Sequence, residues 1–459
     1  MSRPRRQNDT YPRLPRKVLF DEYGNLHQLG EMLDQGGQGV VYRTTDDDLA
    51  IKQPLDTDNH PGRIDSQRNR FKNLRLLPFP HRIPVSLPLA TLRDEPGYVM
   101  RLLNGMKPFA ILDLDGNTRS KLKRDVKNGD LILPEWLSQI PDQNKALQFL
   151  HYARTGSTRR RLLALSKCAA ILSRLHNAGL VYGDISPNNV FVGDDSPSEV
   201  WLIDVDNLRF ELREDGRSTY TPRYGAPEVV QRRDQSRPRT DCWAFAVMAF
   251  ETLALCHPFI GRKVLQPDND NLGWDADPPA DGVPADPFEQ AYAGNLPYID
   301  DNKDDSNAEF TPALPRELIA TAKLRDLFQM TLGEGRTQPH HRPAMFFWAL
   351  EMARAHDQSL ACQECKMSFF EDNTPNCPYC HTPRPPFARA KTNRWQVLIP
   401  ADTKEFALPH RMFNDFSLEH HDDTAHEVVL NFTEKTALPV RGTKAFPDDL
   451  VFEFEEAVQ

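Results

Sequence analysis

Three oxygen-bearing side chains lie close together in the sequence around two short apolar runs. Asp184 and Asn189 precede the run 190–192, and Asp204 follows the run 200–203. Apolar runs that flank a polar turn are typical of a β-hairpin, which would bring the three side chains to one cleft. Phosphoryl transfer from ATP needs this set, because one carboxylate must orient the attacking hydroxyl while an amide and a second carboxylate hold Mg²⁺.

The stretch resembles the catalytic core of eukaryotic-type protein kinases, which reads H-R-D-x-K-x-x-N and then, after a short hairpin, D-F-G. Here the two motifs read Y-G-D-I-S-P-N-N and D-V-D. The spacing from acid to amide is kept, whereas Gly183 and Ser186 replace the usual arginine and lysine. The resemblance implies that Asp184 orients the acceptor hydroxyl and that Asn189 and Asp204 hold Mg²⁺ or Mn²⁺.

Length and composition are typical of a globular protein with more than one domain. The chain has 459 residues, of which 26% are charged and 39% hydrophobic. Its net charge of −9 argues against a general nucleic-acid binder. No apolar run has the length of a membrane span, and the N-terminus lacks the apolar core of a signal peptide. We therefore expect a cytoplasmic protein without membrane contact and without a disulfide framework.

Residues 18–53 predict a β-rich unit with a glycine-rich turn. Strands are expected at 18–20, 29–33, 40–42 and 49–52. The turn D-Q-G-G-Q-G-V-V resembles the kinase loop G-x-G-x-x-G-x-V, whose glycines let backbone N–H groups approach phosphate oxygens. A glycine cluster alone is more often an ordinary hairpin turn. However, Ala50 and Lys52 follow one strand later and resemble the kinase A-x-K, whose lysine holds the α- and β-phosphates.

A helix at 63–77 and a strand at 97–100 complete the expected small lobe. In kinases this helix supplies a glutamate that pairs with the lysine, but here it contains none, and Asp65 is a shorter substitute. Residues 101–103 take the hinge position, where backbone groups face adenine. The resemblance implies that ATP is bound by Gly36, Gly37, Gly39, Val41, Ala50, Lys52, Met100, Arg101 and Leu103, together with Asn189 and Asp204.

The expected large lobe contains a long amphipathic helix at 158–178, directly before the catalytic stretch. Further on, the triplet at 226–228 resembles the A-P-E that closes the kinase activation segment. Thr221 stands where Ser/Thr-directed kinases keep a threonine beside the catalytic acid. Gly183 replaces the arginine that reads a phosphate in regulated kinases, so we expect constitutive or partner-controlled activity rather than activation by phosphorylation. The candidate phosphorylation sites are Ser218, Thr219 and Thr221.

Two more landmarks follow in the same order as in kinases. Asp241 opens an apolar helical stretch that resembles the kinase D-x-W segment, whose aspartate caps the catalytic-loop backbone. Arg342 resembles the arginine that pairs with the A-P-E glutamate, so an ion pair between Glu228 and Arg342 is expected. The segment 262–312 is rich in Asp, Pro and Asn and predicts a long surface insertion.

Four of the seven cysteines form two C-x₂-C pairs with 11 residues between them. Two such knuckles supply the four thiolates of a closed, structural Zn²⁺ site and resemble a zinc ribbon. A redox pair and unrelated free thiols are the alternatives. The proposed ligands are Cys362, Cys365, Cys377 and Cys380. The other cysteines, which we expect in the core, are Cys168, Cys242 and Cys256.

After a proline-rich linker at 382–386, short apolar runs alternate with polar turns and predict a small β-rich module. The runs lie at 395–399, 427–432 and 450–454. Four histidines in this part have no regular spacing, so surface positions are expected rather than a metal site. They are His410, His420, His421 and His426.

The expected fold class is α+β, with a bilobal kinase-like core. Its parts are a disordered basic arm (1–17), a small lobe (18–103), a large lobe (104–356), a zinc ribbon with its linker (357–386) and a β-rich C-terminal module (387–459). Basic residues alternate with prolines in the arm, which favours disorder over nucleic-acid or membrane binding.

The resemblance as a whole implies a protein Ser/Thr kinase of bacterial style that uses ATP and a divalent metal and acts on a protein substrate or with a regulatory partner. Its combination of features looks most like stress-operon kinases associated with tellurite-resistance genes. A nucleotide-binding pseudokinase is an alternative, because Ser186 removes a cation beside the γ-phosphate and the helix glutamate is missing. An adaptor that works through the ribbon and tail is a third interpretation.

Overall fold

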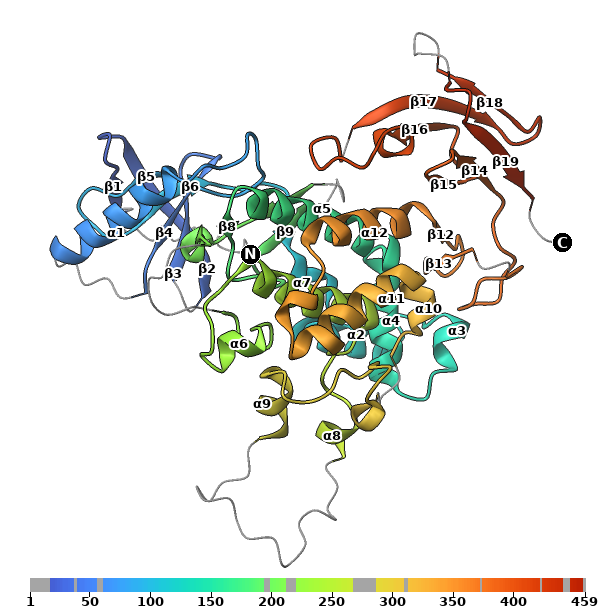
Figure 1. Cartoon of the computed structure of the whole chain (residues 1–459), viewed down its shortest axis with the longest axis horizontal. Coiled ribbons are helices and arrows are strands. Elements are labelled where there is room, and N and C mark those ends of the chain that lie inside the picture. Colours follow the sequence, from blue (N-terminus) through green and yellow to red (C-terminus); the bar gives the residue numbers. More distant parts are fainter. Residues whose placement is uncertain are drawn as a thin grey trace, which may run out of the picture. The chain divides into compact units, whose positions relative to one another are not determined.

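The computed structural model describes residues 17–36, 39–55, 61–193, 199–211, 220–266, 286–308, 313–371, 374–421, 423–440 and 446–456. Contacts divide the chain into an N-terminal unit, residues 1–78 with 85–105, and a C-terminal unit, residues 79–84 with 106–459. Figure 1 shows the helices and strands of both units. Their mixture confirms the expected α+β class.

The N-terminal unit is built on an antiparallel six-stranded sheet with the order β1-β2-β3-β4-β6-β5. Its strands are β1 (Val18–Phe20), β2 (Leu26–Gly36), β3 (Gly39–Thr44), β4 (Leu49–Gln53), β5 (Pro88–Thr91) and β6 (Tyr98–Arg101). One helix, α1 (Pro61–Arg75), buries Phe71 and Leu74, and the Phe71 ring lies 4.4 Å from that of Tyr98. The sequence predicted all of these elements except β5, which begins with proline and shows no alternating pattern.

Three helices form the centre of the C-terminal unit. The longest, α5 (Ser157–Asn177), packs along α12 (Met345–Asp357) and against α7 (Pro238–Ala254), as Figure 1 shows. Nearly every residue of α7 is buried, which explains its apolar sequence on all sides. Among the described residues, no helix has both the length and the apolar character that crossing a membrane requires.

Shorter helices surround this centre. They are α2 (Gly116–Asn128), α3 (Glu135–Ser138), α4 (Gln143–Arg154), α6 (Pro227–Val230), α8 (Arg262–Leu265), α9 (Pro287–Tyr292), α10 (Arg316–Ile319) and α11 (Ala322–Phe328). The helix α4 is held against α5 partly by a hydrogen bond between the Tyr152 and Thr158 hydroxyls, 3.0 Å apart.

Short strands bracket the catalytic stretch. The predicted hairpin is present, because β9 (Val190–Gly193) pairs with β10 (Val200–Leu202), and β9 also pairs with β7 (Met106–Pro108). The hairpin turn lies outside the described residues. A second pair joins β8 (Leu180–Val181) to β11 (Arg209–Phe210). These two pairings fix both ends of the loop between β8 and β9 and of the segment that follows β10.

The C-terminal part contains one small hairpin and two three-stranded sheets. The hairpin pairs β12 (Ser359–Ala361) with β13 (Ser368–Phe370). The sheets have the orders β15-β14-β19 and β16-β17-β18. Their strands are β14 (Phe387–Lys391), β15 (Gln396–Pro400), β16 (Glu405–Pro409), β17 (Thr424–Asn431), β18 (Thr436–Pro439) and β19 (Val451–Glu455).

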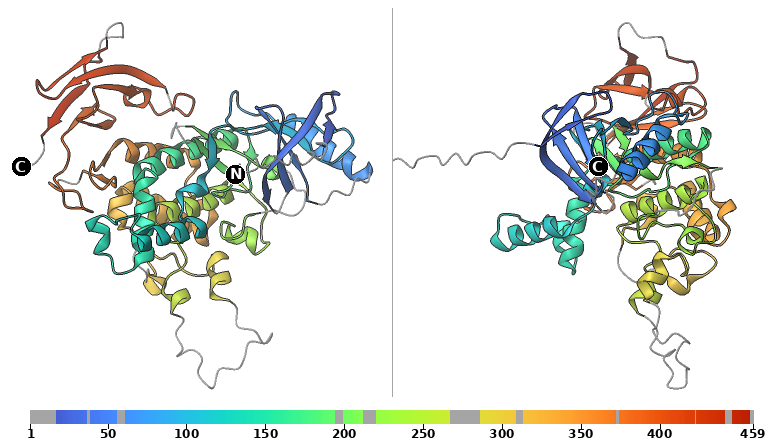
Figure 2. Two further views of the ribbon diagram at one scale, coloured as in Figure 1. Left: turned by 180° about the vertical axis from the view of Figure 1, so that it is seen from behind. Right: turned by 90° about the vertical axis from the view of Figure 1, so that its left-hand side faces the viewer.

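The two C-terminal sheets share a hydrophobic core with α12. Ala353 of α12 lies in one cluster with Val397 and Ile399 of β15 and Val428 of β17. Figure 2 shows both sheets beside α12 from two further directions. The strands β15, β17 and β19 fall on the three apolar runs that the sequence indicated, and they are not separated from the helices by a free linker.

Three segments are packed more tightly than the sequence predicted. In the expected linker, Arg384 is buried and forms an ion pair with Glu371 at 3.3 Å. His421, expected at the surface, is buried, and its Nε2 lies 2.6 Å from the Ser166 hydroxyl of α5. In the expected surface insertion, Asn307 is fully buried and donates to two backbone carbonyls. Long-range packing, which local patterns do not encode, explains each difference.

Candidate functional site

The loop that carries Asp184 is held by the carboxylate of Asp241, in the first turn of α7. The backbone N–H groups of Tyr182 and Gly183 each donate to Asp241 at 2.9 Å. His176 Nε2 lies 2.9 Å from the same carboxylate, which is only 1% exposed. This confirms the predicted capping role of Asp241. Gly183 has a φ of +81°, a backbone conformation that side chains disfavour, so glycine suits this turn.

Two hydrogen bonds tie together the three residues that the motif singled out. Asn189 Nδ2 donates to the backbone carbonyl of Asp184 at 2.8 Å. The N–H of Ile203, the residue before Asp204, donates to the carbonyl of Asn189 at 3.0 Å. The Asn189 side chain also carries an amide oxygen, which takes no part in this bond. The donor set therefore fits a divalent metal such as Mg²⁺, which prefers oxygen ligands.

The buried side chain of Tyr182 also contributes to this arrangement. The Tyr182 hydroxyl donates to the carbonyl of Ile203. Burial, with the carboxylates of Asp204 and Asp184 nearby, raises the pKa of Tyr182 well above its usual value of 10. The phenol therefore stays protonated and remains a donor. Asp204 itself begins a short 3₁₀ turn, η2 (Val205–Asn207), with a φ of +57°.

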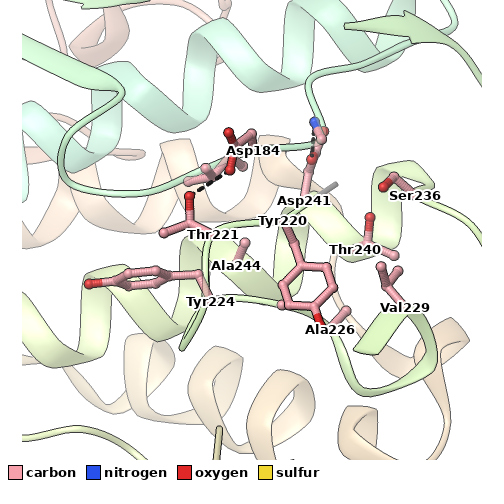
Figure 3. A pocket seen from close by; sticks show the side chains of 13 residues that line it. Asp184, Tyr220, Thr221, Tyr224, Ala226, Val229, Ser236, Thr240, Asp241 and Ala244 are labelled. Atoms are coloured by element: carbon pink, nitrogen blue, oxygen red, sulfur yellow. Dashed lines mark hydrogen bonds between the residues drawn. The ribbon is translucent and has the colours of Figure 1, made fainter. Parts of the chain in front are cut away.

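The carboxylate of Asp184 accepts hydrogen bonds on both oxygens. The Thr221 hydroxyl donates to Oδ1 at 2.6 Å, as Figure 3 shows, and Asn207 Nδ2 donates to Oδ2 at 3.3 Å. The predicted position of Thr221 beside the acid is thus confirmed. Asp184 is 4% exposed. Beside it, a cavity of about 20 Å³ is also lined by the Tyr220 ring, and it has room for roughly one water molecule.

The end of the activation segment is anchored by the predicted ion pair. Nη1 and Nη2 of Arg342 donate to the two carboxylate oxygens of Glu228, at 2.6 and 2.8 Å, and the Arg342 side chain is 0% exposed. Arg342 Nε also donates to the carbonyl of Gly335 at 2.8 Å. Nearby, the Tyr224 hydroxyl donates to the Glu251 carboxylate at 2.9 Å. The chain that follows Thr221 is therefore fixed to α7 and to the segment before α12.

In the N-terminal unit, the sheet register sets the predicted nucleotide-binding residues side by side. Val41 of β3 pairs with Lys52 of β4, and Ala50 of β4 pairs with Met100 of β6. Ala50 is fully buried and Lys52 is 8% exposed. The strands thus bring together four residues that lie up to 59 positions apart in the sequence.

The structure also describes parts of the glycine-rich turn and of the expected hinge. Gly36 pairs with Gly39, where a Cβ atom would lie 2.4 Å from the Gln53 carbonyl, so no other residue fits without a shift. Gly37 lies outside the described residues. Arg101 ends β6, and Leu103 follows it.

Asp65, the expected substitute for the missing helix glutamate, lies in α1. Asp65 forms an ion pair with Arg68 of the same helix at 2.9 Å, and 65% of the Asp65 side chain is exposed. Glu95, the next glutamate along the chain, accepts a hydrogen bond from Gln53 Nε2 at 2.8 Å. The Asp65 carboxylate thus has a partner in its own helix.

Comparison with known proteins bears on the segment that carries the site. Residues 143–273 match the family model described as the protein kinase domain. This part of the chain is related to protein kinases. It includes Asp184, Asn189, Asp204 and Asp241, and it begins with α4.

Individual kinases match the chain over limited lengths. Ribosomal protein S6 kinase alpha-2 of Homo sapiens is 28% identical over 184 residues, which cover 36% of this chain and 24% of the relative. Ribosomal protein S6 kinase alpha-6 of Danio rerio is 28% identical over 183 residues, with the same shares. CBL-interacting protein kinase 4 of Oryza sativa subsp. japonica is 36% identical over 91 residues, covering 19% of this chain and 20% of the relative. The chain thus spans about a quarter or less of each relative's length.

A second site lies beyond the kinase-related segment, where four cysteine sulfurs lie within 4.8 Å of one another. Sγ of Cys362 is 3.6 Å from that of Cys380, and Sγ of Cys365 is 3.6 Å from that of Cys377. These distances are too long for disulfides, whose sulfurs lie about 2.05 Å apart. They match a tetrahedral site, in which metal–sulfur bonds of about 2.3 Å separate the sulfurs by about 3.8 Å.

The two knuckles have the same backbone design. The N–H of Lys366 donates to the carbonyl of Cys362 at 3.1 Å, and the N–H of His381 donates to the carbonyl of Cys377 at 3.0 Å. Lys366 and His381 both have positive φ, 63° and 59°. Each turn therefore closes on its first cysteine and directs both of its thiols to the same point.

Sequence reasoning missed two residues of the kinase-related site. Asn207 follows the D-V-D triplet without any motif of its own, and His176 lies in the last turn of α5 among several polar residues. Only the folded chain shows that Asn207 reaches Asp184 and that His176 reaches Asp241. The expected core positions of Cys168 and Cys242 are confirmed, and Cys256 is partly buried.

Proposed function

We propose that the chain is an ATP-dependent protein Ser/Thr kinase that transfers the γ-phosphoryl group to protein hydroxyls. The hydrogen bond from the Thr221 hydroxyl to Asp184 carries this proposal, since it holds the carboxylate on the loop that also bears Asn189. Asp184 acts as the carboxylate that orients the acceptor hydroxyl. The preference for serine and threonine rests on Thr221, which stands where Ser/Thr-directed kinases keep a threonine.

The function requires ATP and a divalent metal. Asn189 offers a side-chain oxygen and Asp204 a carboxylate, so these two residues would hold Mg²⁺ or Mn²⁺. A bound metal supplies neutralisation of the phosphate charge. Lys52 and the turn at 36–39 would position the phosphates, and residues 101–103 would face adenine. The chemistry then rests on positioning rather than on a covalent intermediate.

We also propose that the four cysteines bind one structural Zn²⁺, which the sulfur spacing supports. The ribbon at 357–386 would follow a small lobe at 18–103 and a large lobe at 104–356 and precede the β-rich module at 387–459. In this scheme the protein is cytoplasmic, of the bacterial stress-operon type, and works on a protein substrate or with a regulatory partner.

A pseudokinase is the second candidate, and one observation favours it. Ser186, which takes the place of the usual lysine, is 2% exposed, and the N–H of Asn189 closes a turn on its carbonyl at 3.0 Å. The position thus contributes a small buried hydroxyl to the loop instead of a long cation toward the γ-phosphate. Such a site would bind nucleotide without transferring phosphate.

Label transfer from radiolabelled ATP to a basic acceptor protein tests the proposal. The wild type should transfer label with Mg²⁺ or Mn²⁺. Asp184→Ala should lower the rate of label transfer by a factor on the order of 10² or more without changing the affinity for nucleotide. Asp204→Ala should lose metal-dependent nucleotide binding. Asp130→Ala, at an exposed position, is the matched control. Metal-dependent ATP binding without transfer above the Asp184→Ala level would favour the pseudokinase.

A further inference from the structure

The amide of Asn207 occupies one side of the Asp184 carboxylate. Asn207 Nδ2 lies 3.3 Å from Oδ2, while the Thr221 hydroxyl lies 2.6 Å from Oδ1. The two donors come from different segments, η2 and the chain before α6, and both are uncharged.

Backbone structure explains how Asn207 reaches this position. It closes η2, in which the Leu208 N–H donates to the Val205 carbonyl at 3.0 Å and Val205 is fully buried. The next residues pair with β8, through Arg209 opposite Val181, directly before the catalytic loop. The turn and the strand pair therefore fix the Asn207 backbone from both sides.

The glycine in the catalytic loop lies next to this turn. A Cβ atom at Gly183 would lie 3.4 Å from the carbonyl oxygen of Asn207 and 3.7 Å from its Cβ. Both are ordinary van der Waals distances, so η2 packs directly against the loop at Gly183. The residue that takes the place of the usual arginine and the residue that contacts Asp184 are neighbours in space.

We propose that Asn207 is a positioning residue for Asp184, an inference that rests on the proposed function of the same site. The Asn207 side-chain amide and the Thr221 hydroxyl hold the carboxylate in one rotamer. That rotamer fixes the direction in which the carboxylate meets the acceptor hydroxyl. Asn207 does not itself touch substrate in this scheme.

An exchange of the two side chains tests the contact independently of catalysis. Asn207→Asp sets two carboxylates at hydrogen-bond distance, and Asp184→Asn leaves two amides there. The double variant restores one amide and one carboxylate. Urea unfolding at pH 8 measures the unfolding equilibrium constant of each variant. In the double variant this constant should be at least about tenfold smaller than the two single effects together would give. Additive single effects would overturn the proposal, whether or not the protein transfers phosphate.

Kinetics then separate positioning from mere structural support. Asn207→Ala should lower kcat about tenfold with unchanged affinity for nucleotide, because the Asp184 carboxylate loses one of the donors that orient it. Asn128→Ala, exposed at the end of α2, should leave kcat unchanged. An Asn207→Ala enzyme with the wild-type kcat would contradict the positioning role. A wild type without any transfer would contradict the proposed kinase activity, while the exchange experiment would still decide on the contact.

Discussion

Arg342 and Glu228, which lie 114 residues apart in the sequence, form a two-pronged ion pair inside the protein. The guanidinium is fully buried, lies 4.9 Å from the Trp243 ring centroid and donates to two backbone carbonyls as well. The pair joins the end of the activation segment to the chain before α12. It therefore holds a segment near Thr221 that has little regular structure of its own.

Breaking this pair should destabilise the protein strongly. Arg342→Leu leaves the Glu228 carboxylate buried without its partner, which costs about 3–5 kcal/mol of unfolding free energy. Urea unfolding would measure the loss. Arg394→Leu is the matched control, because Arg394 and Asp415 form an exposed ion pair, and it should cost at most about 1 kcal/mol. Equal losses in the two variants would argue against the burial effect.

Loss of one ribbon cysteine should affect both metal content and the neighbouring helix. The wild type should carry about one Zn²⁺ per chain, and Cys377→Ser should carry much less, whereas Cys256→Ser should match the wild type. The backbone N–H of Ser368, in β13, donates to the Ser157 hydroxyl at the start of α5. Amide exchange at the start of α5 should therefore accelerate in Cys377→Ser. Metal-free wild-type protein, purified without chelators, would contradict the zinc site.

Phosphorylation of Thr221 should inhibit rather than activate. Its hydroxyl already donates to Asp184, and a phosphate there would set a negative group against the carboxylate. Thr221→Glu should lower transfer by on the order of 10². Thr221→Ser keeps the hydroxyl and should retain most activity. A Thr221→Glu variant as active as wild type would contradict this arrangement.

Two buried histidines should make the fold sensitive to acid. Burial lowers the pKa of His257 from 6.5 to about 3, and burial together with the Arg159 guanidinium does the same for His356. Both stay neutral in the folded protein, while the unfolded chain gains protons below about pH 6.5. Above about pH 6.5 the two histidines therefore do not reduce the free energy of unfolding. As the pH falls from about 6.5 toward 3, this free energy decreases.

The His356→Asn variant isolates one of these contributions. Asparagine keeps a donor for the Arg159 carbonyl, which lies 3.0 Å from His356 Nδ1, but it does not titrate. Between pH 7.5 and pH 5, the variant should lose about 2 kcal/mol less unfolding free energy than the wild type. Identical losses would show that His356 titrates normally.

The sequence alone predicted those parts whose information is local. The helix α5 has a periodic apolar face, and the residues of the catalytic loop stand within one short stretch, so type and spacing indicated them. The ion pair of Glu228 with Arg342 was also predicted, because the resemblance to kinases supplied a pairing that no local pattern contains.

The sequence did not predict contacts between distant segments. Asn207 belongs to no motif, and its role depends on a strand pair that sets η2 against the catalytic loop. His421 was placed at the surface because nothing in its neighbourhood indicates Ser166 of α5, 255 residues earlier. The burial of Arg384 likewise depends on Glu371 and on the sheets beyond it.

The shared core of α12 and the C-terminal sheets has a consequence for the order of events during synthesis. The Ser166 hydroxyl meets His421 only after 255 more residues have been added, which takes about 13–50 s at about 5–20 residues per second. Once α12 has been made, its apolar face around Ala353 stays uncovered until Val428 of β17 has been added, which takes about 4–15 s at the same rate. During this interval the nascent chain exposes a hydrophobic surface that can bind a chaperone or aggregate.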